Sequence, residues 1–440
     1  MSAPNDQRHG DAVGTRSRLI ERTPFYYGWL ILFAGTLGAM MTIPGQTTGV
    51  SIFIDHLIVD LGLTRSGVST LYLVATLVGS LALPFVGRFV DRRGPRLAVT
   101  VIAAAFALAC VWMGAARDAL MLLIGFTLVR ALGQGSLSLV SQHVVAIWFV
   151  RRRGVAIGMV GVGMAIATAS FPTLIERLIE ASDWRIAYML LGALVACTIL
   201  PVGALVFRDR PERFGLLPDG PAQGAADAGG GAPRPAPKAL RRERHHTPDE
   251  ARRTLTFWVF LTGLFFSSTL GTGLVFHHYS ILAEGGLDRL DAARTFVYYG
   301  ITAAAANLGT GALIDRVAPR FLLSASVAAL AATLVFAALF VGPATVVPYG
   351  ILMGLRTGSF SSLQGNVFAY YFGRRHLGSI KGWVSTVLVV GSALGPLLFA
   401  VGFDLLGSYT VTVAASALPP LVLALVVPFL RLVRPDGSVR

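Results

Sequence analysis

Apolar stretches of membrane-spanning length recur along this chain, and no other feature of the sequence restricts the fold as strongly. Many of them approach the roughly 20 residues that a helix needs to cross a hydrocarbon layer about 30 Å thick. Only 14% of the 440 residues are charged and 54% are hydrophobic, so a water-soluble fold has too little polar surface to cover these stretches. The sequence therefore predicts an all-α membrane protein that uses the lipid bilayer as its solvent.

Two sets of six spans are expected, which predicts twelve transmembrane helices in two six-helix bundles. The first set covers 26–50, 67–87, 97–116, 119–147, 155–177 and 186–207, and the second covers 255–282, 295–314, 320–341, 345–370, 377–402 and 408–430. The expected domains are a cytoplasmic N-terminal tail (1–24), an N-terminal bundle (25–207), a cytoplasmic linker (208–253), a C-terminal bundle (254–431) and a cytoplasmic C-terminal tail (432–440). The linker is rich in Pro, Gly and Ala without apolar periodicity, which predicts a mobile connection.

Basic residues alternate between rich and poor connections along the chain. The rich segments precede the first span and follow the second, fourth and sixth spans. By the positive-inside rule these segments and both termini are cytoplasmic, which requires an even number of spans. The net charge of +14 is thus spread between spans, whereas a nucleic-acid partner requires basic residues gathered on one soluble face. We expect a monomer in a plasma membrane of the bacterial inner-membrane type.

Signs of enzyme chemistry are missing from the sequence. Both cysteines, Cys110 and Cys197, lie inside apolar stretches, where neither a disulfide framework nor a cysteine metal site is expected. No H-E-x-x-H, G-x-S-x-G or Walker pattern occurs, so neither a membrane enzyme nor ATP hydrolysis finds support. We predict no enzymatic activity, no cofactor and no metal.

The two halves of the chain resemble each other at a nearly constant offset. The stretch GRFVDRRGPR at Gly87 recurs as GALIDRVAPR at Gly311, a shift of 224 positions. The stretch WFVRR at Trp148 recurs as YFGRR at Tyr371, a shift of 223 positions. Homologous halves predict a substrate site near the bilayer midplane, between the two bundles.

The pattern G-x-x-x-D-R-x-G-x-R in the connection after the second span resembles the signature of the major facilitator superfamily. The resemblance implies that Asp91, with Arg92 and Arg96, latches the two bundles together in the outward-facing state and releases them during alternation. Arginines that only set topology in a tight turn are the alternative, but that role does not explain Asp91 or Gly94. The expected gating residues of both copies are Gly87, Asp91, Arg92, Gly94, Arg96, Gly311, Asp315, Arg316 and Arg320.

A second resemblance extends through the fourth and fifth spans. Gly133-Gln-Gly135, the aromatic-Phe and basic residues from Trp148 to Arg153, and the glycine-rich stretch that follows resemble the monocarboxylate and oxalate/formate porter branch of this superfamily. The resemblance implies a small organic anion, a monocarboxylate or a dicarboxylate, as the substrate.

Two arginines are expected deep in the membrane. Arg130 and Arg356 lie close to the midplane of the fourth and tenth spans, and no Asp or Glu lies at comparable depth. The nearest acids, Asp55, Glu176, Glu284 and Asp404, lie toward the outer ends of their spans. A guanidinium holds a carboxylate or phosphate through two parallel hydrogen bonds, so the pair suits an anion. The alternative is a packing role in which both arginines bond to helix carbonyls.

Further candidates for substrate contact are weaker. Lys381 is one helical turn inside the eleventh span, where it either meets the substrate, as the porter resemblance implies, or reaches toward the cytoplasmic interface. His277 and His278 follow Gly271 and Gly273, which are expected to bend the seventh span, and serve either proton coupling or bonds to loop carbonyls. Neutral side chains that either orient substrate or bond across helices are Gln46, Thr47, Thr48, Asn307 and Gln364.

We therefore predict a secondary active transporter that moves a small organic anion by alternating access. Proton symport and anion exchange are both open, so protons are a further candidate partner. A multidrug or cation exporter of the same superfamily is the alternative, although such a protein normally requires buried acids.

Overall fold

The computed structural model describes residues 20, 23–149, 152–219, 246–314, 316–373, 376–430 and 432. Most of the predicted tails and the central part of the linker therefore lie outside the described residues, as do Arg151 and Asp315. The helices of the N-terminal bundle are α2 (Gly28–Met40), η1 (Ile43–Gly45), α3 (Thr47–Ser51), α4 (Ile54–Leu61), α5 (Arg65–Ser80), α6 (Leu83–Arg93), α7 (Pro95–Gly114), α8 (Ala119–Val129), η2 (Arg130–Leu137), α9 (Ser138–Trp148), α10 (Arg153–Ala181), α11 (Trp184–Leu205) and η3 (Pro211–Phe214). Those of the C-terminal bundle are α12 (Pro248–Arg252), α13 (Leu255–Phe276), α14 (His278–Glu284), α15 (Arg289–Leu313), α16 (Pro319–Leu339), η4 (Pro343–Thr345), α17 (Val346–Phe372), α18 (Leu377–Leu406), α19 (Tyr409–Ser416), α20 (Leu418–Val426) and η5 (Val427–Phe429).

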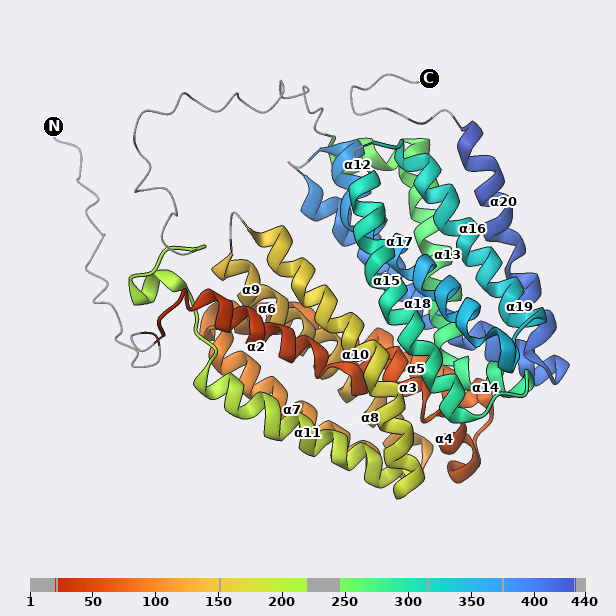
Figure 1. Ribbon diagram of the computed structural model, residues 1–440, viewed down its shortest axis with the longest axis horizontal. Helices are drawn as coiled ribbons and strands as arrows, with labels where there is room; N and C mark the ends of the chain where they lie inside the picture. The colour runs from red at the N-terminus through yellow and green to blue at the C-terminus, as the bar shows by residue number, and fades with distance from the viewer. Residues whose placement is uncertain are drawn as a thin grey trace.

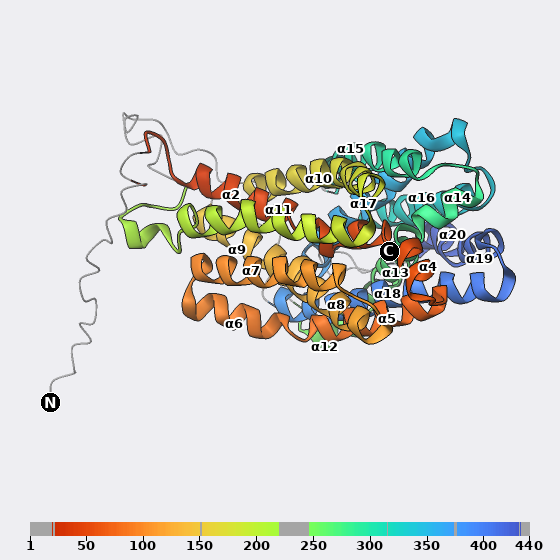
Figure 2. The same ribbon diagram turned by 90° about the horizontal axis from the view of Figure 1, so that it is seen from below.

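The two bundles form the arms of a V (Figure 1). They meet at the end that carries α4 and α14, which we call the closed end, and diverge toward the end that carries α9 and α12, which we call the open end. Figure 2 shows the same two groups of helices side by side along the long axis. Across the junction, α10 packs on α15, α5 on α18 and α3 on α13.

Ten segments of the described chain are long and apolar enough to cross a membrane. Helices α15 and α17, of 25 and 27 residues, complete the twelve predicted spans, six in each bundle. Their sequences are less hydropathic because α15 begins with Arg289, Asp291 and Arg294, and α17 is rich in Gly and Ser. These two helices pack on each other and both help to line the cavity between the arms, so parts of their surfaces do not need large apolar side chains.

A glycine stripe brings α15 and α17 into close backbone contact. A Cβ atom at Gly350, Gly354 or Gly358 would lie only 2.8, 2.5 or 2.2 Å from a carbonyl oxygen of α15. Any side chain at these positions would force the helices apart, as expected for small residues spaced four apart in a membrane interface. The stripe thereby fixes α17, and the residues it carries, against the cavity wall formed by α15.

The motif at Gly87 begins as a helix, within the predicted connection after the second span. After a break at Leu81 and Ala82, α6 continues to Arg93, and only Gly94, with a φ of 82°, makes the turn into α7. Arg92 and Arg93 occupy the last turn of α6, where positive charge stabilises the carbonyl end of a helix dipole. The helix therefore extends past the apolar span.

Candidate functional site

A cavity of about 410 Å³ lies between the two arms, with walls from both bundles. This volume is within the range of small-molecule binding sites. Its lining residues come from η1 and the adjoining α3, from α10, from α15 and from α17: Ile43, Gln46, Thr48, Gly161, Met164, Ala165, Thr168, Tyr299, Gly300, Ala303, Ala304, Asn307, Thr357, Gly358 and Ser361. The cavity thus brings together three predicted candidates, Gln46, Thr48 and Asn307.

Four polar lining residues, Thr168, Tyr299, Thr357 and Ser361, are not among the candidates expected from the sequence. Hydroxyl side chains are common inside membrane helices, where those of Ser and Thr bond to carbonyls of their own helix, so these four residues do not stand out individually in the sequence. The spacing of Thr357 and Ser361, four residues apart on α17, was the available signal. Thr357 also has a buried Oγ1 without a hydrogen-bond partner among the described residues.

Arg130 is buried, with 5% of its surface exposed, and neutral groups hold it. Its Nε donates to Thr76 Oγ1 at 3.1 Å, and its Nη1 donates to Thr47 Oγ1 at 3.3 Å and to the Gly45 carbonyl at 3.4 Å. The guanidinium carbon lies 4.6 Å from the centre of the Tyr72 ring, a cation-π contact. Arg130 opens η2, a π-helical segment, and such bulges often mark functional positions.

Arg356, with 4% of its surface exposed, has fewer contacts than Arg130. Among the described residues its one hydrogen bond runs from Nη1 to the Ser267 carbonyl of α13 at 3.5 Å, and its Nε has no partner there. No ion pair involves either arginine in the described part of the chain. Two buried guanidiniums without a carboxylate leave net positive charge inside the junction.

Neither guanidinium belongs to the cavity lining, but each is linked to it through a neighbouring residue. Thr47, which binds Arg130, stands between the lining residues Gln46 and Thr48, and Arg356 precedes the lining residue Thr357. In a low-dielectric interior, a buried charge attracts an opposite charge even when a neutral side chain lies between them. The cavity therefore combines a neutral hydroxyl and amide lining with positive potential from both arms.

The other predicted contact residues lie away from the cavity. Lys381 donates to the Gly365 carbonyl at 2.7 Å, and Gln364 is not among the lining residues. His277 lies between the Pro396 carbonyl and the Tyr409 hydroxyl, at 2.8 and 2.9 Å, and His278 lies 2.9 Å from the Ala292 carbonyl. Both histidines are thus anchored in the protein interior, away from the cavity wall.

Gly271 and Gly273, which were expected to bend the seventh span, lie within helix α13. Helix α13 runs unbroken from Leu255 to Phe276. A Cβ atom at Gly273 would lie 2.7 Å from the Gly395 carbonyl oxygen of α18, so this glycine permits close approach of two helices. Glycine in a packed membrane helix thus serves close contact between helices.

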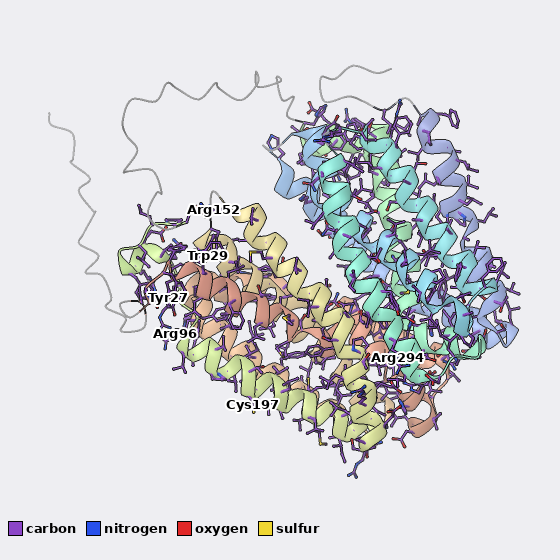
Figure 3. All side chains as sticks on the ribbon, in the orientation of Figure 1. Tyr27, Trp29, Arg96, Arg152, Cys197 and Arg294 are labelled. Carbon is purple, nitrogen blue, oxygen red and sulfur yellow. The ribbon has the colours of Figure 1, made fainter. Side chains whose placement is uncertain are left out.

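The predicted gating residues occupy the open end, where the arms are apart. Arg96 donates two hydrogen bonds, of 2.9 and 2.6 Å, to the Ala204 carbonyl of α11, and Figure 3 shows it at the far end of the N-terminal bundle. In the second copy, Arg320 donates to the Leu430 carbonyl at 3.2 Å. The side chain of Asp91 is not described. Gly87 and Arg92 lie on α6, Gly311 lies on α15, and Arg316 lies between α15 and α16.

Charged residues tie the two arms together at the closed end. Arg289 of α15 donates from Nε to Glu176 Oε1 of α10 at 2.6 Å, contacts Asp55 Oδ2 at 3.5 Å and bonds to the Ile52 carbonyl. Arg65 pairs with Asp55 at 2.8 Å, and both bond to the hydroxyl of Ser280 from the opposite arm. These residues, which we call the closed-end network, must separate before this end can open.

Asp55 remains ionised in this network at neutral pH. Burial alone raises its pKa, but the Arg65 guanidinium, the Ser280 hydroxyl and Arg289 together hold the pKa below its ordinary value. Because the folded-state pKa is lowered, the stabilisation from Asp55 is complete above its unfolded value of about 3.9 and is lost only as the pH falls through the lower folded value. Titration of Asp55 therefore does not release the closed end near neutrality.

Asp55 and Glu176 were expected at the outer ends of their spans, but their pairing with Arg65 and Arg289 was not predicted. The available signal was that all four charges lie on the same predicted side of the membrane. Which cation meets which acid depends on how the arms pack, and the one-dimensional pattern does not contain that information.

Comparisons with known proteins agree with this architecture. The family model of the Major Facilitator Superfamily matches residues 28–347 and, in a second overlapping match, 279–440. The solved structure of a bacterial homolog to the human lysosomal transporter Spinster, in an inward-facing and unoccupied conformation, superposes with a TM-score of 0.66 at 15% identity, covering 92% of this chain and 96% of that one. At this identity the likeness concerns the fold.

Curated relatives match parts of the chain. The uncharacterized MFS-type transporter YhcA of Bacillus subtilis is 29% identical over 40% of this chain, and the oxalate:formate antiporter of Oxalobacter formigenes is 24% identical over 55%. Monocarboxylate transporter 6 of Homo sapiens is 24% identical over 56%. The matches span 31%, 52% and 48% of those proteins, about a third to a half of their length. The predictions of a major facilitator fold and of a transporter in place of an enzyme are confirmed, and the chain belongs to the Major Facilitator Superfamily of integral membrane transporters.

Proposed function

We propose that this protein carries a small organic anion, a monocarboxylate or a dicarboxylate, across the membrane by alternating access. The observation that carries the proposal is the pair of buried arginines, one from each arm, behind a cavity whose described lining contains no charged residue. A carboxylate in the cavity is attracted by both guanidiniums and accepts hydrogen bonds from the lining hydroxyls and amides. The names of two relatives, an oxalate:formate antiporter and a monocarboxylate transporter, support the same substrate class.

Anion exchange suits this site better than net transport of the anion alone. Unpaired positive charge inside a membrane protein is costly, and rearranging the arms around an empty cavity leaves Arg130 and Arg356 without a counter-charge. A bound anion supplies that charge during the rearrangement. The loaded protein is therefore expected to change conformation faster than the empty one, which favours exchange of one anion for another.

The open end is assigned to the cytoplasm in this proposal. The arginine-rich segments after the second and fourth spans lie at the open end, and Arg96 and Arg152 mark them in Figure 3. With the positive-inside rule, the conformation is inward-facing. The closed-end network then serves as the external gate.

The gating role of the Gly87 motif gives a kinetic prediction. In the outward-facing state, α6 is expected to approach the start of α18, and Asp91 is expected to hold that contact. Replacement Asp91→Asn should lower the exchange rate of the purified protein in proteoliposomes severalfold, while equilibrium binding of the substrate changes less than twofold. A large loss of binding with an unchanged exchange rate would argue against the latch.

A ligand screen tests the substrate class directly. Thermal unfolding of the detergent-solubilised protein should shift upward with mono- or dicarboxylates, because a ligand that binds only the folded state raises its stability by about 2.7 kcal/mol at a hundredfold excess over Kd. Amines and neutral sugars of similar size are the matched negative set. Stabilisation by organic cations, with none by carboxylates, would overturn the anion assignment and favour a cation exporter.

A further inference from the structure

The backbone of Gly271 lies directly against the guanidinium of Arg356. A Cβ atom built on Gly271 would lie 2.1 Å from Nη1, 2.9 Å from Cζ and 3.2 Å from Nη2 of Arg356. All three distances concern the far end of one flexible side chain, and no backbone atom is among them. An added methyl group therefore displaces the guanidinium away from α13 without forcing the two helices apart.

Hydrogen bonds do not fix the position of Arg356. The one bond from Nη1 to the Ser267 carbonyl is long, at 3.5 Å, and Nε has no partner among the described residues. Arg130 differs, because three hydrogen bonds and the Tyr72 ring hold it. The bare backbone at Gly271 is thus a steric constraint on where the Arg356 guanidinium rests.

We infer that Gly271 is a positioning residue for the anion site, which sets how far the Arg356 guanidinium lies behind the cavity wall. The inference rests on the proposed anion-transport function and adds a residue to it. The depth of a charge behind a neutral wall controls how strongly it attracts a substrate carboxylate. Misplacement of a binding group by about 1 Å can cost a factor of 100 in rate.

The substitution Gly271→Ala tests this inference, with Gly309→Ala as the matched control. A Cβ atom at Gly309 of α15 meets nothing within 4 Å, so both variants add one methyl group to a membrane helix. We expect Gly271→Ala to lower kcat/KM for anion exchange in proteoliposomes by about tenfold or more, and Gly309→Ala to leave it within twofold. Thermal unfolding without ligand should be similar for both variants.

A double variant separates positioning from general damage to α13. Lysine is shorter than arginine and keeps the charge, so its ammonium should not meet a methyl group at position 271. In an Arg356→Lys background, Gly271→Ala should therefore cost less than twofold in kcat/KM. A tenfold cost in that background as well would mean that the methyl group damages transport independently of the guanidinium, and would overturn the inference.

The outcomes also distinguish this inference from the proposed function. If Arg356→Ala transports anions at the wild-type rate, the anion site itself is wrong. If Arg356→Ala abolishes transport while Gly271→Ala behaves like Gly309→Ala, the anion site stands and only the positioning role of Gly271 fails.

Discussion

Replacement Arg356→Ala is expected to abolish anion exchange while the protein still folds and inserts. Arg356 makes one long hydrogen bond and no ion pair in the described part of the chain, so its removal leaves no unpaired acid behind. The substrate carboxylate, by contrast, loses one of the two charges that attract it. Losing one partner of a buried charged contact costs about 2–5 kcal/mol, which corresponds to a rate loss of roughly 30-fold or more.

The measurement is exchange of a radiolabelled carboxylate by purified protein in proteoliposomes. Arg117→Ala is the matched control, because Arg117 is exposed, in the connection between α7 and α8. Expression and elution as a single species in size-exclusion chromatography report folding of both variants. Wild-type exchange by Arg356→Ala would exclude Arg356 from the substrate site.

Replacement Arg289→Gln is expected to open the closed end. The guanidinium binds Glu176, Asp55 and the Ile52 carbonyl of the opposite arm, and all three contacts disappear together. Glu176 is 1% exposed, so its carboxylate stays buried without a cation as long as this end is closed. Breaking a buried pair in this way costs about 3–5 kcal/mol, enough to shift a conformational equilibrium by a factor of 100 or more.

Distances between spin labels at Val59 on α4 and Ala283 on α14 would report this opening, in a background without Cys110 and Cys197. Both positions are exposed. A population with longer distances should appear in Arg289→Gln and decline again when Glu176→Gln is added, because the double variant has no unpaired buried charge.

The control for this experiment is Arg294→Gln. Arg294 pairs with Asp291 of its own helix at 2.8 Å and lies near the junction of the arms (Figure 3). Its ion pair does not cross between bundles, so the distance distribution should stay as in the wild type. An Arg289→Gln distribution identical to that of Arg294→Gln would show that the closed-end network does not hold the arms together.

Twelve spans in two homologous sets of six could be predicted from the sequence, because membrane insertion imposes a length and an apolar composition on every span. Composition alone does not identify α15 and α17 as membrane spans, because their glycines serve helix contacts and the charged residues of α15 serve the closed end. The sequence also singles out Arg130 and Arg356, because an arginine deep in an apolar stretch is rare enough to require an explanation.

Tertiary packing alone decided how these residues are grouped. The apolar spans predicted at the outset do not reveal that Thr168, Tyr299, Thr357 and Ser361 share one cavity, that Arg289 meets Glu176, or that Gly271 lies against Arg356. Each of these contacts joins helices that are far apart in the sequence. Hydropathy does not determine how each helix is rotated about its axis. The bilayer dictates that the segments become helices, and the close contacts between small residues determine which faces meet.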